Sequence, residues 1–225
     1  ARRKPPLDWR LLTRTFEREA ALLQRCAHPS VVEFCGLYQG ADELALVLEL
    51  AEGGDCQQLL QRHGPLAERA VHAMVGQVCD ATLHVHSLGI LHRDIKCENV
   101  LVSAGAAPVG PRVKLCDFGH SCALGELGSS RRLASFRGTV GYAAPEVSCS
   151  SPAWSYAADP WGVGALLYTL LGNTALRWAD GGAAPLESSR RSLLLLLLLL
   201  LNRASSAAGA PDFSTRNFLR VSTAA

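Results

Sequence analysis

Several features that would assign a chain to a specialised class are missing from these 225 residues. The eight cysteines contain no C-x-x-C pair and no metal-ligand spacing, so we expect reduced thiols in ordinary core or surface positions. Lysine and arginine are scattered and the formal net charge is only +2, which argues against a nucleic-acid partner. No internal repeat is present. The chain therefore reads as an ordinary globular protein.

Long apolar stretches are also scarce. The longest is the leucine run at 193–201, and it is half of the roughly 18 consecutive apolar residues that a membrane-spanning helix needs. No secretory signal opens the chain. With 48% hydrophobic and 19% charged residues, the composition favours a packed core. We expect a soluble cytoplasmic protein without a membrane span, and access to the nucleus is left open.

Hydrophobic periodicity predicts helices and strands in one chain. Residues 8–27 fit an amphipathic helix with Glu19 inside its apolar face, where a carboxylate needs a cation partner unless it lies at the exposed edge. An apolar helix is expected at 159–172, with Pro160 tolerable only in its first turn. The other expected elements are strands at 28–34, 43–50 and 112–116, a long helix at 65–87 and a small-residue loop at 103–111.

One stretch, "LHRDIKCENVLV" at 91–102, places six polar residues between two apolar flanks. A plain buried strand is excluded because each charge would need a partner. A solvated turn would not need apolar strands on both sides. The remaining interpretation is a rigid, half-buried loop that holds an acid, a cation and an amide in fixed relation, as a catalytic or binding site requires.

The polar motifs occur in a characteristic order: H-R-D-I-K-C-E-N at 92–99, D-F-G at 117–119 and A-P-E at 144–146. Together they resemble the signature set of the eukaryotic protein kinase family, and the residues in and around these motifs are most similar to those of the testis-specific serine/threonine kinases. The resemblance implies an α+β, two-lobed kinase-like fold over residues 1–178. Its N-lobe part would be 1–51 and its C-lobe part 52–178, followed by a divergent low-complexity tail at 179–225.

The resemblance implies an ATP-dependent serine/threonine protein kinase that uses Mg²⁺ and acts on a protein substrate. Phosphoryl transfer needs alignment of a hydroxyl with the γ-phosphate and neutralisation of its charge. Asp94 would orient the hydroxyl and accept its proton, with Lys96 near the transferring phosphate and Arg93 beside Asp94. Asn99 and Asp117 would supply the hard oxygen ligands that Mg²⁺ prefers.

Further residues take roles by the same resemblance. Lys4 would hold the nucleotide phosphates and pair with Glu19. Thr139 would meet Asp94 and Lys96, and Ser135 would be an activation-loop phosphosite that docks on Arg93, unless it is an unmodified loop serine. The other expected nucleotide contacts are Leu48 as gatekeeper, Glu49 and Ala51 in the adenine hinge, Asp55 at the ribose and Leu101 beneath the adenine. A hydrophobic column would contain Leu23, Phe34, His92 and Phe118.

The chain also departs from the family pattern. No G-x-G-x-x-G loop precedes Lys4, and Pro160 and Gly162 stand where helix formers are expected. The segment after residue 178 does not resemble the family's C-terminal helices. These departures keep two alternatives open, a non-catalytic pseudokinase-like scaffold and an inactive truncated kinase fragment. The sequence does not indicate the substrate or the oligomeric state.

Overall fold

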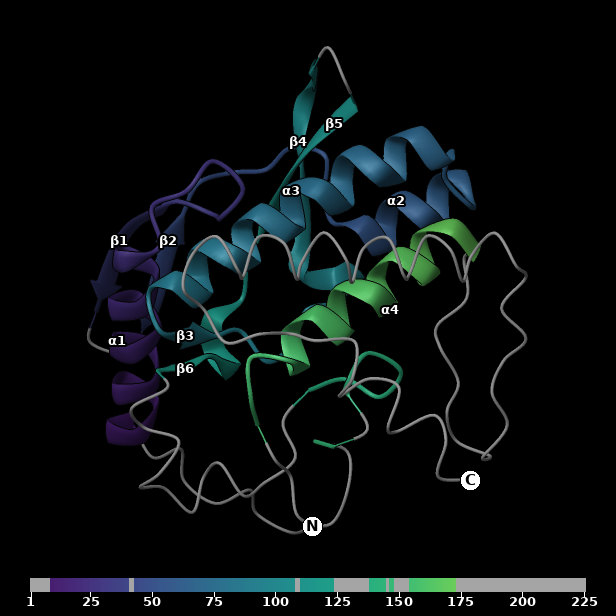
Figure 1. Cartoon of the computed structure of the whole chain (residues 1–225). Coiled ribbons are helices and arrows are strands. Elements are labelled where there is room, and N and C mark those ends of the chain that lie inside the picture. The colour runs from purple at the N-terminus through teal and green to yellow at the C-terminus, as the bar shows by residue number, and fades with distance from the viewer. Residues whose placement is uncertain are drawn as a thin grey trace, which may run out of the picture.

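A computed structural model describes residues 9–40, 43–107, 110–123, 138–144, 146–147 and 154–172, and the structural statements below concern these residues. The chain combines helices with three two-stranded antiparallel sheets, β1–β2, β3–β6 and β4–β5. Figure 1 shows α1 beside β1 and β2 on the left, α2 and α4 on the right, and α3 running across the middle. The arrangement confirms the predicted α+β class.

The first helix, α1 (Trp9–Arg25), matches the predicted amphipathic segment. Its apolar face buries Leu22 and Leu23, and Cys26 beyond its end is buried in the same cluster. The helix contacts β1 (Phe34–Gln39), β2 (Leu44–Leu48) and the short 3-10 turn η2 (Phe118–His120). This contact brings Glu19 toward the D-F-G segment.

The first strand does not lie where the sequence placed it. A strand was expected at 28–34, but β1 begins at Phe34, with Tyr38 opposite Ala45 of β2. Val31 and Val32 are buried because they meet β5 (Gly110–Leu115), where the Val32 amide donates to the Leu115 carbonyl at 2.9 Å. The apolar character of the two valines therefore reflects packing in the core, and neither valine is part of the β1–β2 hairpin.

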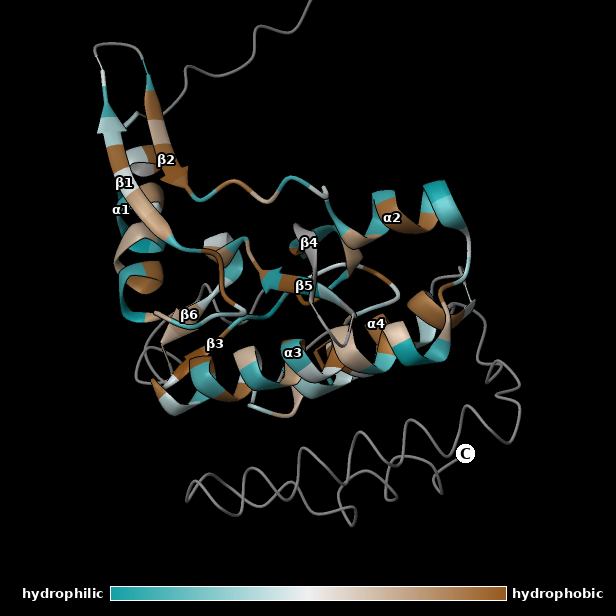
Figure 2. Cartoon of the chain, turned by 90° about the horizontal axis from the view of Figure 1, so that it is seen from above, coloured by the Kyte–Doolittle hydropathy of each residue, from teal (hydrophilic) through white to brown (hydrophobic). Residues whose placement is uncertain are grey.

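The long helix α3 (Glu68–Ser87) and the last helix α4 (Ala158–Gly172) lie side by side. Polar and apolar residues alternate over the surface of α3 in Figure 2, whereas most of α4 is buried. Pro160 lies in the first turn of α4, as predicted, where its missing N–H removes no helical hydrogen bond. Among the described residues, no helix is long and apolar enough to cross a bilayer.

A hairpin replaces most of the loop predicted at 103–111. Strand β4 (Val100–Ala107) continues to Ala107 and pairs with β5, with a register shift between Ser103 and Ala106. It projects at the top of Figure 1. Small residues suggested a loop, but backbone pairing satisfies their N–H and C=O groups in a strand equally well. The short helix α2 (Cys56–His63) precedes this region, and β3 (Ile90–Leu91) pairs with β6 (Cys122–Ala123) below it.

Candidate active site

The polar loop, residues 92–99, is anchored at both ends. Ile90 and Leu91 in β3 are fully buried before it, and Val100 is fully buried after it. The 3-10 turn η1 (Cys97–Asn99) closes the loop. The apolar flanks thus fix the backbone, while most of the polar side chains between them are buried too.

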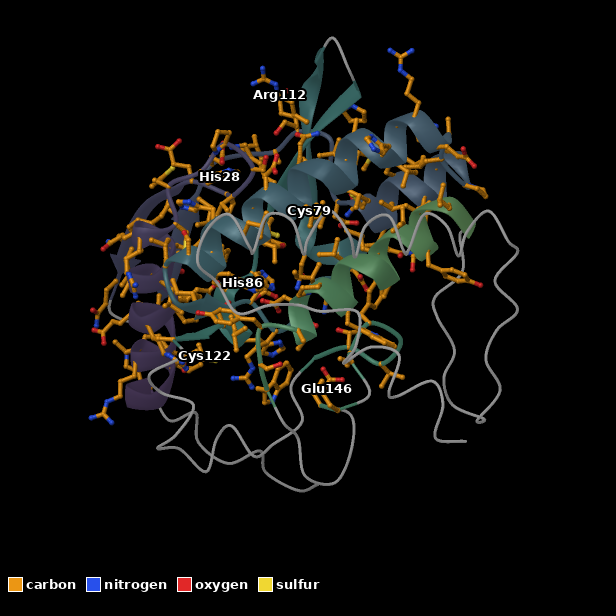
Figure 3. The ribbon with its side chains drawn as sticks, in the orientation of Figure 1. His28, Cys79, His86, Arg112, Cys122 and Glu146 are labelled. Atoms are coloured by element: carbon orange, nitrogen blue, oxygen red, sulfur yellow. The ribbon has the colours of Figure 1, made fainter. Side chains whose placement is uncertain are left out.

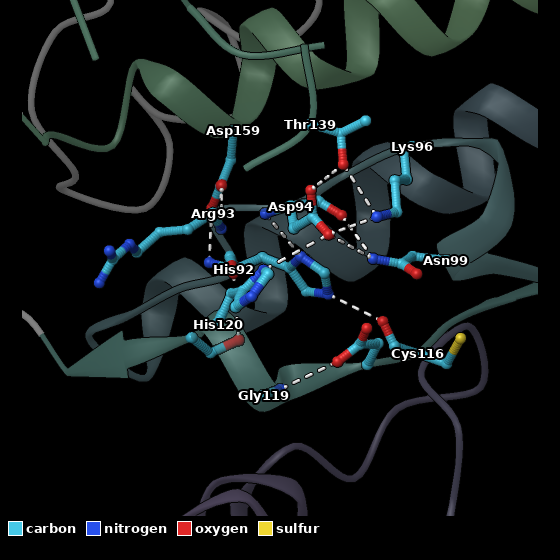
Figure 4. A network of polar contacts seen from close by, with 12 residues as sticks. His92, Arg93, Asp94, Lys96, Asn99, Cys116, Gly119, His120, Thr139 and Asp159 are labelled. Atoms are coloured by element: carbon cyan, nitrogen blue, oxygen red, sulfur yellow. Dashed lines mark hydrogen bonds and ion pairs between the residues drawn. The ribbon is translucent and has the colours of Figure 1, made fainter. Parts of the chain in front are cut away.

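Asp94 is the centre of the polar network in Figure 4. Its carboxylate is 3% exposed, with Oδ2 2.7 Å from Lys96 Nζ and Oδ1 accepting the Thr139 hydroxyl at 2.8 Å. Asn99 Nδ2 donates to the Asp94 backbone carbonyl at 2.8 Å and to Oδ2 at 3.1 Å. Burial alone would raise the pKa of Asp94, but the hydrogen bonds from Lys96 and Thr139 hold it below its usual value. The structure therefore brings Asp94, Lys96, Asn99 and Thr139 together.

Asp159, from the first turn of α4, anchors the backbone of the polar loop. Its Oδ1 accepts the Arg93 amide and its Oδ2 accepts the His92 amide, both at 2.8 Å. His86 Nε2, from the last turn of α3, lies 2.7 Å from the same Oδ2; Figure 3 shows His86 in the interior. Burial would raise the pKa of Asp159, but the His86 hydrogen bond and nearby charges keep it below its usual value.

The sequence assigned no role to Asp159 or His86. The available signal was a carboxylate inside an apolar helical segment, because such a group needs partners when it is buried. Asp159 is 2% exposed and two of its three partners are backbone amides of the polar loop. It therefore sets the backbone conformation of that loop, in which Arg93 has a left-handed φ of 73°.

His92 connects the polar loop to the D-F-G segment. Its Nε2 donates to the Cys116 carbonyl at 3.0 Å, and its ring meets Phe118 edge-on with centroids 4.9 Å apart. Burial lowers the pKa of His92, which keeps the imidazole neutral. Leu23 and Phe118 are buried in one cluster, against which Phe34 packs. The residues expected to form the hydrophobic column thus lie in or beside that cluster.

The D-F-G segment faces α1. Asp117 has a left-handed backbone, with φ 60° and ψ 78°, and its Oδ1 accepts the Gly119 amide at 3.2 Å. Burial and the charge of Asp117 raise the pKa of Glu19, and a hydrogen bond with the Phe118 backbone partly offsets them. Lys4, the expected partner of Glu19, lies outside the described residues, as does Ser135.

The expected metal ligands lie on adjoining segments. The Cys116 amide donates to the Asn99 carbonyl at 2.9 Å, which joins the end of the polar loop to the residue before Asp117. Asn99 uses its Nδ2 toward Asp94, so its Oδ1 is the amide atom suited to a cation. The described residues contain no group of three or more His, Cys, Asp or Glu side chains that would hold a metal alone. This donor set fits Mg²⁺, which usually takes one or two carboxylates and completes its shell with phosphates and water.

Most of the expected nucleotide contacts lie between the end of β2 and the start of α2, and Leu101 lies in β4. Glu49 Oε1 lies 2.6 Å from Lys114 Nζ and accepts the Glu33 amide at 2.6 Å, so its side chain joins the hinge to β5. Asp55 caps α2 by accepting the Gln58 amide at 2.8 Å. Leu48 ends β2, Ala51 is half-buried, and Leu101 forms an isolated bridge with Asp55. The cap occupies one carboxylate oxygen of the residue expected at the ribose.

Cys116, directly before D-F-G, is a poor nucleophile. It is 9% exposed, and burial followed by the charge of Asp117 raises its pKa to about 12. Because the thiolate is the reactive form, the thiol is inert at neutral pH.

Known proteins match this chain over most of its length. The family model for the protein kinase domain matches residues 6–216. Testis-specific serine/threonine-protein kinase 3 of Homo sapiens is 36% identical over 162 residues, which cover 71% of this chain and 58% of that protein. Calcium/calmodulin-dependent protein kinase type 1B of Rattus norvegicus is 35% identical over 156 residues, 69% of this chain and 43% of that protein.

A yeast relative is similar to the same degree. Serine/threonine-protein kinase cds1 of Schizosaccharomyces pombe is 34% identical over 164 residues, which cover 71% of this chain and 34% of that protein. The matched region thus spans between 34% and 58% of the three relatives.

Proposed function

This chain belongs to the protein kinase domain family, whose matched relatives here are serine/threonine kinases, and we propose that it transfers the γ-phosphate of ATP to protein serine or threonine hydroxyls. The observation that carries the proposal is the buried carboxylate of Asp94 between Lys96 and Thr139. Its lowered pKa keeps the carboxylate ionised at neutral pH and able to accept a proton.

In the proposed reaction, Asp94 would orient the substrate hydroxyl and take its proton as the oxygen bonds to the γ-phosphorus of ATP. The bond between that phosphorus and the β–γ bridging oxygen would break, and ADP would leave. Lys96 Nζ, 2.7 Å from Asp94 and 2.8 Å from the Thr139 hydroxyl, places positive charge beside the substrate oxygen. Asp159 and Asn99 hold the loop in place beforehand, so little reorganisation is needed at the moment of transfer.

Mg²⁺ and ATP would be held by residues from both sides of this network. Asn99 and Asp117 would ligate the metal, which when bound neutralises charge on the phosphates. Lys4 would contact the phosphates and pair with Glu19. Leu48, Glu49, Ala51, Asp55 and Leu101 would line the nucleoside side. We also propose a cytoplasmic location for the protein.

Phosphorylation of Ser135 is proposed as the regulatory step. A phosphate there would dock on the Arg93 guanidinium and order the segment that leads to Thr139. Substitution Ser135→Ala should lower activity, measured as peptide phosphorylation. Unchanged activity would remove Ser135 from the proposal and leave the catalytic assignments intact.

The first test is the melting temperature of the purified chain with ATP alone, with ATP and Mg²⁺, and with neither. We expect a rise that requires Mg²⁺ and disappears in Asp117→Asn. A cooperative melt without a nucleotide-dependent shift would favour the pseudokinase-like scaffold. No cooperative melt would identify the chain as a fragment whose chemistry belongs to a longer protein.

The second test is phosphoryl transfer to a peptide containing serine. Removing a general base costs roughly 10²- to 10⁴-fold in rate, so Asp94→Asn should lose activity by that order. Exposed Glu17→Gln serves as the matched control and should leave the rate unchanged. Wild-type rates in the Asp94→Asn variant would overturn the catalytic role.

A further inference from the structure

One edge of the Arg93 guanidinium is buried without hydrogen bonds. Arg93 is 8% exposed, and its backbone amide is held by Asp159. Its Nε and Nη2 atoms are buried and have no hydrogen-bond partner among the described residues. The guanidinium lies close enough to the Cys122 thiol to lower the pKa of that thiol, although burial raises it overall. A buried cation with an unpaired edge needs some other source of stabilisation.

That source is the face of an indole ring. The Arg93 Cζ atom lies 4.4 Å from the ring centroid of Trp154, within the range of a cation–π contact. The indole Nε1 is also buried without a hydrogen-bond partner among the described residues, so Trp154 contributes its π face and not its N–H. The ring itself is fixed because it packs against a small cluster formed by Ala144, Val147 and Ala158.

We propose that Trp154 is a positioning residue that fixes the plane of the Arg93 guanidinium and, through it, the polar loop at Asp94. The inference rests on the proposed kinase function, in which Asp94 is the reacting carboxylate. Arg93 directly precedes Asp94, and the left-handed φ of 73° at Arg93 leaves its backbone little freedom to compensate. A rotation of the side chain is therefore transmitted to the neighbouring carboxylate.

The stacking also leaves a defined edge of the guanidinium. Nε and Nη2 point the same way and form the fork that binds an oxyanion through two parallel hydrogen bonds. With the ring on its face, this buried fork is held in one orientation.

The first experiment needs no kinase activity. NMR spectra of the isotope-labelled chain should show the Arg93 side-chain signals shifted upfield by the indole ring current, with Arg93→Lys used to assign them. The shift should persist in reduced form in Trp154→Phe and disappear in Trp154→Leu. Arg93 signals that are unshifted in the wild type, or unchanged in Trp154→Leu, would overturn the proposal.

A double-mutant cycle tests the energetic coupling between the two side chains. The unfolding of Trp154→Leu, Arg93→Leu and the double variant should be non-additive, because Trp154 loses its partner once Arg93 is gone. Additive effects would overturn the proposal. If Trp154→Leu does not fold, Trp154→Met removes the π face with an unbranched side chain that adapts to irregular gaps, and it takes the place of Trp154→Leu in both experiments.

Kinetics separate positioning from packing. In a chain that phosphorylates peptide, Trp154→Leu should lower kcat roughly tenfold or more with the KM for peptide unchanged, and Trp154→Phe should recover most of the rate. An equal loss of kcat in the Phe and Leu variants would mean that Trp154 contributes only by packing and would overturn the positioning role. A wild-type chain without activity would refute the proposed function, while the NMR result and the cycle would still decide the role of Trp154.

Discussion

At the scale of single residues, the polar loop depends on buried carboxylates that keep all their partners. Asp159 is 2% exposed and accepts hydrogen bonds from His86, His92 and Arg93. The three donors come from α3 and the polar loop. A carboxylate buried in this way stabilises the fold only as long as the whole set is present, since each lost partner leaves an unpaired polar group.

Asp159→Asn should therefore destabilise the protein strongly. The amide keeps the shape, but it replaces one accepting oxygen with a donor that faces other N–H groups, and a cost of about 3 kcal/mol is expected for a broken buried network. Urea unfolding measures this change. The control Glu17→Gln, at an exposed site on α1, should stay within about 0.5 kcal/mol. A loss no larger than the control would contradict the role given to Asp159.

At the scale of elements, α4 packs against the polar loop so closely that a side chain at Gly162 would be crowded. A Cβ on Gly162 would lie 3.1 Å from the Ile95 carbonyl oxygen and 3.2 Å from the Ile95 Cβ. Gly162 departs from the helix-forming pattern of the sequence, and this contact supplies the reason. Helix propensity is given up so that α4 can bring Asp159 to within hydrogen-bond distance of the loop.

Gly162→Ala should consequently destabilise the protein by roughly 1 kcal/mol or more, despite the better helix propensity of alanine. The matched control is Gly76→Ala, on the exposed side of α3, where a Cβ meets nothing within 4 Å. That control should be neutral or should stabilise by about 0.5–1 kcal/mol. The melting temperatures of the two variants give the comparison. A higher melting temperature for Gly162→Ala would contradict the prediction, because it would show that the polar loop moves to accommodate the methyl group.

The hinge and β5 form a second connection between elements. Glu49 and Lys114 are 2.6 Å apart and about one-fifth exposed, with side-chain exposures of 24% and 19%. A double-mutant cycle of Glu49→Gln and Lys114→Met should give a coupling free energy of about 0.5–1 kcal/mol, since solvent screens the pair. The swapped variant, Glu49→Lys with Lys114→Glu, should recover part of it. A coupling free energy of zero would mean that the ion pair does not contribute to stability and that Glu49 acts only through its hydrogen bond with the Glu33 amide.

At the scale of the whole molecule, the ionisable groups predict how stability depends on pH. The pKa of His92 is lowered from 6.5 mainly by burial, so the folded state excludes a proton that the unfolded chain binds below that pH. Asp94 and Asp159 have pKa values below 3.8, so their stabilisation is present above that pH and is lost as the pH falls through the folded values. Glu19, with a raised pKa, acts in the opposite direction at low pH.

The free energy of unfolding should accordingly fall in two stages as the pH drops, first below about 6.5 and again below about 4. Urea titrations at pH values from 7.5 to 3 would show both stages. In Asp159→Asn the second stage should be shallower, because that carboxylate no longer titrates. A stability that is constant or increases toward acid pH would contradict the buried, neutral state of His92 and the ionised state of Asp159.

The sequence alone determined the family, the α+β class, the helices at 8–27, 65–87 and 159–172 and the position of the polar loop, because these depend on local motifs and periodicity. It misplaced the strand at 28–34 and predicted a loop at 103–111, where β4 continues to Ala107 and β5 begins at Gly110, since buried valines and small residues do not distinguish pairing from packing. Lys4 and Ser135 stay predictions outside the described residues.

Only the tertiary structure decided which residues hold the site. His86 and Asp159 are 73 positions apart, and Trp154 meets Arg93 from another segment. No periodicity relates such positions. Their contacts arise where α4 packs against α3 and the polar loop, and burial there makes each polar atom depend on a partner that the neighbouring sequence does not contain.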